Sequence, residues 1–99
     1  MSAYLVAHLA VTNPDAFEAY RAVVPEVIAR FGGRYLVRGG IVETLEGEWR
    51  VPRLVIIAFD SMEQAKRFYH SPDYQEILPL RQAAAEGEVV LVEGVPGAS

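Results

Sequence analysis

One segment constrains the fold of this chain more than any other. Residues 53–59 read RLVIIAF and are apolar on both faces of the strand that they predict. A strand that is apolar on both faces needs cover on both sides of its sheet. The chain has 99 residues, the size of one domain, so little is left to cover a sheet twice. The segment therefore predicts a sheet with helices on one face and a second copy of the chain on the other.

The remaining strands follow from apolar alternation and from short apolar runs. We expect them at residues 3–11, 34–39 and 88–93, beside the strand at 53–59. We also expect the side chains of Arg34, Leu36 and Arg38 to share one face of the second strand, because side chains alternate along a strand.

Capping signals place three helices between these strands. Asn13 before Pro14 begins the first helix, Ser61 begins the second, and Ser71 before Pro72 begins the third, which we expect to end near residues 86–87. The order is then βαββαβ with a split second helix. This is the ferredoxin-like α+β arrangement, a four-stranded antiparallel sheet with helices on one face. We expect one domain over residues 1–94 and a flexible tail over residues 95–99.

Composition excludes several classes of function. Thirteen acidic and nine basic residues give a net charge of −4, so nothing favours binding to nucleic acid. The chain has no cysteine and two histidines, and we expect neither a metal site nor a bound cofactor. No segment approaches the roughly 20 apolar residues of a membrane span, and no targeting signal is present. We expect a cytoplasmic protein with no membrane partner.

Several motifs in combination point to a known family. They are residues 13–20, which begin Asn-Pro-Asp and end at Tyr20; FGGRYLVRGG at 31–40; Glu-Gly-Glu-Trp at 46–49; Ser-Pro-Asp-Tyr at 71–74 with Arg81; and Val-Glu-Gly at 92–94. From Tyr4 to Gly94 the chain resembles a bacterial family of small proteins, known only as a domain of unknown function, in the dimeric α/β-barrel superfamily. The resemblance implies a homodimer in which two sheets form a barrel, and it implies no activity. The superfamily includes cofactor-free monooxygenases of aromatic polyketides, muconolactone isomerases and haem-binding enzymes, and fold analogy does not choose among them.

Three residues are candidates for catalysis. His8 lies mid-strand on the face that would line the dimer barrel, where it could act as a base or remain a satisfied interface group. His70 and Tyr74 flank the start of the third helix. Tyr74 and Arg81 are seven residues apart, so they share a helix face, and we predict that both border one cavity. There they could bind and polarise a phenol or carbonyl. Alternatively, Tyr74 packs edge-on and Arg81 bonds a helix-end carbonyl or a carboxylate.

Arg38, Ser71, Tyr74, Arg81 and Trp49 are candidates for ligand binding. Arg38 precedes two glycines that let a ligand approach the backbone, although an interface ion pair explains the arginine equally well. Ser71 is as readily a helix cap, and Trp49 could cover a pocket or anchor a partner.

Two functions stay open. The first is a dimeric small-molecule enzyme, resembling a cofactor-free monooxygenase or an isomerase, that acts on an apolar or aromatic, enolisable substrate. The second is a non-catalytic dimeric module that binds a metabolite or a protein. An apolar cavity with convergent polar groups favours the enzyme, and a filled interior favours the module.

Overall fold

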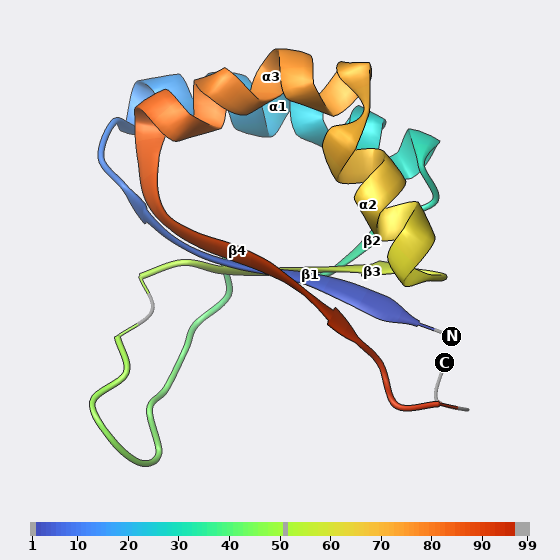
Figure 1. The fold of residues 1–99 in the computed structure, drawn as a ribbon. Helices are drawn as coiled ribbons and strands as arrows, with labels where there is room; N and C mark the ends of the chain where they lie inside the picture. The colour runs from blue at the N-terminus through green and yellow to red at the C-terminus, as the bar shows by residue number, and fades with distance from the viewer. Residues whose placement is uncertain (1, 51, 97–99) are drawn as a thin grey trace.

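The computed structural model describes residues 2–50 and 52–96, and it confirms the predicted order of elements. The elements are β1 (Ala3–Val11), α1 (Pro14–Arg30), β2 (Arg34–Arg38), β3 (Leu54–Phe59), α2 (Met62–His70), α3 (Pro72–Ala84) and β4 (Ala85–Glu93). The strands form one antiparallel sheet in the order β2-β3-β1-β4, with the helices on one face (Figure 1). This is the expected ferredoxin-like fold. No helix within residues 2–50 and 52–96 is long and apolar enough to cross a membrane.

The core lies between the sheet and the helical layer. In β1 the side chains of Leu5, Ala7 and Leu9 are buried, and in β3 those of Ile57 and Phe59 are buried. Leu5 pairs with Ile57 across the two central strands, so both side chains point to the same side of the sheet. The largest side chains that are almost wholly buried are Phe59, Phe68 and Ile28.

The opposite face of the sheet is largely apolar at its centre, and no helix of the described residues covers it (Figure 1). We call it the outer face; its apolar side chains are those of Tyr4, Val6, Val37, Leu54, Ile56, Val90 and Val92. Val90 and Val92 remain 55% and 47% exposed. The connection between β2 and β3 extends away from the helices on this same side (Figure 1).

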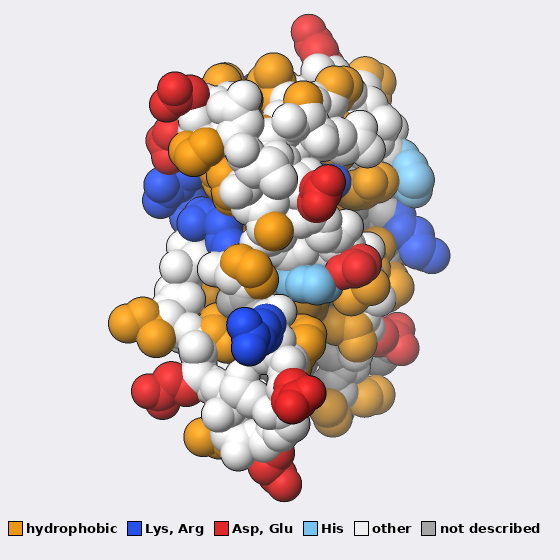
Figure 2. Space-filling model, turned by 90° about the vertical axis from the view of Figure 1, so that its left-hand side faces the viewer, with side chains coloured by type: hydrophobic (Ala, Val, Ile, Leu, Met, Phe, Trp, Pro, Cys, Tyr) orange, Lys and Arg blue, Asp and Glu red, His pale blue; other side chains and the backbone are white. Residues whose placement is uncertain are grey.

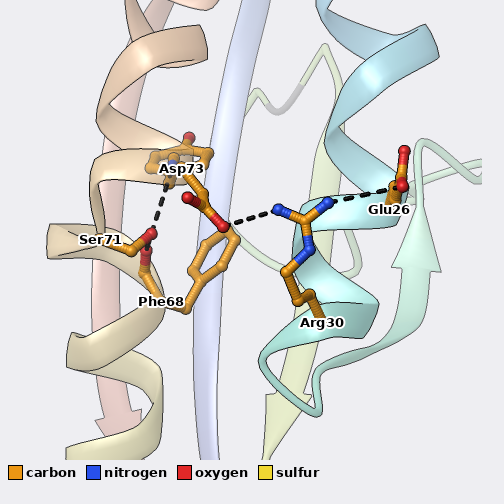
Figure 3. A network of polar contacts seen from close by, with 6 residues as sticks. Glu26, Arg30, Phe68, Ser71 and Asp73 are labelled. Carbon is orange, nitrogen blue, oxygen red and sulfur yellow. Dashed lines mark hydrogen bonds and ion pairs between the residues drawn. The ribbon is translucent and has the colours of Figure 1, made fainter.

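The predicted caps are present. Asn13 accepts a hydrogen bond from the backbone N–H of Ala16, and Ser61 caps α2 through Gln64. Arg30, in the last turn of α1, pairs with Asp73 of α3 at 2.6 Å and joins the two helices near the start of α3 (Figure 3).

The third helix ends earlier than the sequence predicts. It stops at Ala84, and β4 begins at Ala85, because β4 pairs with β1 along its whole length as far as Val11. The carbonyl of Ala84 also accepts hydrogen bonds from the N–H groups of Thr12 and Asn13, which holds the chain in its turn into the sheet. Of the predicted tail, residues 97–99 lie outside the described residues.

Candidate functional site

A cavity opens between the sheet and helices α1 and α3. Its walls are mainly apolar, with Leu5, Leu9 and Ile57 on the sheet, Val24 on α1 and Phe68 on the adjoining α2. It leaves about 40 Å³ of free space, enough for roughly one to three water molecules. With its open mouth it encloses about 510 Å³. Its polar lining consists of three tyrosines and four arginines, which are Tyr20, Tyr35, Tyr74, Arg21, Arg38, Arg53 and Arg81.

Two phenols meet at the helical wall of this cavity. Tyr20 comes from α1 and Tyr74 from α3, and their hydroxyl oxygens lie 2.9 Å apart, with either able to donate. One hydroxyl donates to the other, so one proton of the pair is left for a further acceptor. Tyr74 is only 4% exposed and packs against Phe68, with ring centres 4.6 Å apart. Burial, and to a lesser extent Tyr74, raises the pKa of Tyr20 above its ordinary value, so its phenol is neutral and can donate a hydrogen bond.

Arg81 lies in the last turn of α3 and lines the same cavity as Tyr74, as the helical spacing predicts. Its residue exposure is 8%. Within residues 2–50 and 52–96, no carboxylate lies within 4.0 Å of its guanidinium, so the alternative ion pair is not formed there. A buried cation without a paired anion favours a ligand oxygen that carries negative charge.

Arg38 does not share a face with Arg34, and this prediction was wrong. The register shifts between Tyr35 and Val37, so Leu36 is an extra residue in the strand. Arg34 therefore pairs with Ala58 on the outer side, where it contacts Asp60 at 3.8 Å. Arg38 instead turns toward the helices.

The bulge brings Arg38 to the mouth of the cavity. Arg38 pairs with Val55, and its guanidinium carbon lies 4.7 Å from the centre of the Tyr35 ring. The guanidinium also donates to the backbone carbonyl of Arg21 at 3.3 Å. Arg38 thus reaches the cavity because of a register shift, which the alternation of the sequence does not predict.

Sequence reasoning missed Arg53. It precedes β3, and its guanidinium carbon lies 5.2 Å from the centre of the Phe17 ring. Its Nε is buried and has no hydrogen-bond partner among the residues that the structure describes. Burial lowers the pKa of Arg53, and the nearby charges of Arg21 and Arg38 lower it further. We call Arg21, Arg38 and Arg53 the arginine cluster. In Figure 2 a group of basic side chains lies at the left edge at mid-height, and other basic side chains lie at the right edge and in the lower centre.

The other candidates lie outside this cavity. His8 is on the outer face, as predicted, where its Nε2 contacts the carboxylate of Glu88, and its ring centre is 6.2 Å from that of Trp49. Trp49 is 61% exposed in the loop between β2 and β3, and His70 is exposed at the end of α2.

Ser71 is a helix cap in the structure. Its hydroxyl donates to the carbonyl of Phe68 at 2.7 Å and accepts from the backbone N–H of Tyr74 at 3.1 Å (Figure 3). The part of the chain that the structure describes holds no group of three His, Cys, Asp or Glu side chains that could bind a metal ion.

Comparison with known sequences gives a family. Residues 2–95 match a family described as a domain of unknown function, DUF1330. The chain belongs to the DUF1330 family. No functionally curated protein matches this DUF1330 chain.

Solved structures confirm the fold of the DUF1330 chain. It is similar to a protein of unknown function from Rhodopseudomonas palustris, with TM-score 0.74 and 20% identity over 95% of this chain and 82% of that one. It is similar to a dimeric ferredoxin-like protein of unknown function from Jannaschia sp. CCS1, with TM-score 0.73 and 14% identity over 95% and 100%. It also resembles SnoaB, a cofactor-independent oxygenase from Streptomyces nogalater, with TM-score 0.65 and 18% identity over 95% and 93%. These identities show a shared fold alone.

Proposed function

We propose that this DUF1330 chain is a small-molecule enzyme that stabilises the enolate of an aromatic or enolisable substrate in the cavity. The observation that carries the proposal is the pair of hydroxyls of Tyr20 and Tyr74, 2.9 Å apart in an apolar cavity beside Arg81. Preorganised donors aimed at a developing oxyanion are worth most where water is excluded.

The step needs two movements of charge. A proton leaves the carbon next to a carbonyl, the electron pair of that C–H bond forms a carbon–carbon double bond, and the π electron pair of the carbonyl moves onto its oxygen. The spare proton of the phenol pair donates to this oxygen, and the positive charge of Arg81 stabilises it. Among the described lining residues there is no carboxylate or imidazole. The departing proton therefore passes to a water molecule, for which the cavity has room.

Such an enolate is the common intermediate of the two reaction types considered from the sequence. Return of the proton at another position completes an isomerisation, and attack on dioxygen begins a cofactor-free oxygenation. A substrate larger than a few water molecules enters only if the arginine side chains at the mouth move, because the free interior is about 40 Å³. Arginine side chains have several rotatable bonds and can make this movement.

Phenylpyruvate tests the proposal because it carries an aromatic ring and an enolisable methylene group. In D₂O, NMR should show faster loss of the methylene protons with the protein than without it. Tyr74→Phe should slow the catalysed exchange by about 10²–10³-fold, the usual effect of losing one oxyanion donor. Tyr4→Phe is the matched control, since Tyr4 lies on the outer face. Equal rates for the two variants would refute the assignment.

A non-catalytic binding module is the second candidate, and one observation favours it. The described side chains that line the cavity include no conventional general base. Phenylpyruvate binding that raises the melting temperature without any acceleration of exchange would establish this alternative.

We also propose that the chain forms a two-fold homodimer through the outer face. The support is the apolar surface left there, where Val90 is 55% exposed. Large apolar patches on a protein surface commonly mark interfaces. A two-fold pairing would place each outer face against the same face of the other copy and would remove the exposure from both at once.

A further inference from the structure

We propose that the arginine cluster binds a carboxylate, so that the ligand of this chain is a small organic acid whose apolar body occupies the cavity. The inference deepens the proposed function and rests on it only in that the ligand occupies the same cavity. It adds the class of ligand and the residues that select it.

The cluster holds more positive charge than its protein neighbours balance. Arg21 pairs with Glu18 at 3.3 Å, and their side chains are 41% and 67% exposed. Within residues 2–50 and 52–96, no carboxylate lies within 4.0 Å of Arg38 or Arg53. Three guanidinium groups at one opening repel one another, and a bound anion relieves that repulsion.

Two of the guanidinium groups also lie over aromatic rings. The guanidinium carbon of Arg38 lies over the ring of Tyr35 and that of Arg53 over the ring of Phe17, where the negative face of each ring attracts the cation. A ring contact of this kind uses no N–H group, so hydrogen-bond donors remain for a ligand, apart from the Arg38 N–H that donates to the carbonyl of Arg21. The buried Nε of Arg53 is a donor for which residues 2–50 and 52–96 provide no acceptor. Buried donors in folded proteins normally have a partner, so this N–H marks a place for a ligand oxygen.

The backbone leaves room for this arrangement at one position. Gly39, with a φ of +76°, follows the bulged strand, and a Cβ there would lie 2.7 Å from the guanidinium carbon of Arg53. The bulge and the glycine therefore act together: the first turns Arg38 inward, and the second lets Arg53 lie beside it.

A carboxylate on an apolar body fits this site better than a bare inorganic anion. Guanidinium forks bind planar carboxylates through two parallel hydrogen bonds. Behind the cluster the walls are apolar, formed by Leu9, Phe17 and Val55. The phenol pair and Arg81 come from α1 and α3, so one ligand can place its acid group at the mouth and a second oxygen at the helical wall.

The test compares 3-phenylpropanoate with its primary amide, which has the same shape and no charge. Isothermal titration should show that the acid binds and that the amide binds at least tenfold more weakly. Arg53→Gln should weaken binding of the acid by about 10- to 100-fold, as expected for loss of a charged hydrogen bond, and should leave the amide unchanged. Arg34→Gln is the matched control, because it removes the same charge from the same edge of the sheet on the other face.

Several results would overturn the inference. They are equal affinity for acid and amide, equal weakening by Arg34→Gln and Arg53→Gln, or inorganic phosphate that competes as well as the acid. Thermal melts of each variant establish that it folds, and Arg38→Gln takes the place of Arg53→Gln if the latter does not. Binding of the acid that depends on Arg53 without proton exchange in phenylpyruvate would sustain this inference and refute the enzymatic proposal. Protein-catalysed proton exchange that Arg53→Gln leaves unchanged, together with equal binding of the acid and the amide, would support the enzymatic proposal and refute this inference.

Discussion

Replacing Ile56 by glutamate should separate the proposed dimer into monomers. Ile56 lies at the centre of the outer face, paired with Val6 on β1 and with Val37 on β2. Val6 in turn pairs with Val90 on β4. A charge at this position therefore stands in the middle of the apolar surface, on a strand that has a neighbour on each side.

The magnitude follows from the exposure that remains. Val90 and Val92 are 55% and 47% exposed, and full burial of such a side chain is worth about 1.5–3 kcal/mol. Burying the exposed half of each of these two side chains in the dimer contributes on the order of 1 kcal/mol to its stability. The other outer-face side chains have smaller exposed areas. Burial of the whole outer face therefore stabilises each protomer by about 3–5 kcal/mol and the dimer by about 6–10 kcal/mol. An unpaired buried charge costs several kcal/mol, and the two-fold axis buries two of them, which offsets the whole gain.

Light scattering after size exclusion, at micromolar concentration, measures the outcome. The unmodified chain should have twice its mass of 10.9 kDa, and Ile56→Glu should have 10.9 kDa with a lower melting temperature. Leu80→Glu is the control, because Leu80 lies in the helical layer, is 40% exposed and receives the same charge. A mass of 10.9 kDa for the unmodified chain, or a dimer of Ile56→Glu, would refute the reasoning.

Three further variants test the site and the fold. Because the pKa of Tyr20 is raised in the folded chain, the contribution of Tyr20 to stability is complete below pH 10.0 and is lost as the pH rises toward the raised pKa. Tyr20→Phe should therefore reduce the fall in melting temperature at alkaline pH. An unchanged slope of melting temperature against pH would contradict this. Ser71→Ala should cost about 0.5–2 kcal/mol in urea unfolding and leave acid binding intact, whereas lost binding with unchanged stability would restore Ser71 as a ligand-binding residue. Gly87→Ala should lower the melting temperature far more than Gly40→Ala, because a Cβ at Gly87 would overlap the carbonyl oxygen of His8; equal effects would exclude that overlap.

Helix starts and the strand pattern were predictable because their signals are local. Asn13, Ser61 and Ser71 cap the helices that they were predicted to begin, since a cap bonds the backbone only two or three residues ahead. The place of Tyr74 and Arg81 on one cavity followed in the same way from helical spacing. The end of α3 was not predictable, because it depends on pairing with β1, which lies more than seventy residues earlier in the chain.

The arginine cluster could not be predicted from the sequence. The sequence by itself determined the order of the elements, the two faces of β1 and the presence of a strand that needs cover on both sides. Only the tertiary structure decided that Leu36 is a bulge, that Arg38 therefore turns inward, and that it meets Arg53 and Arg21 there. Alternation and capping act between near neighbours in the chain. A bulge and a convergent cluster depend instead on which strands and helices lie side by side, because folding brings together residues that are distant in sequence.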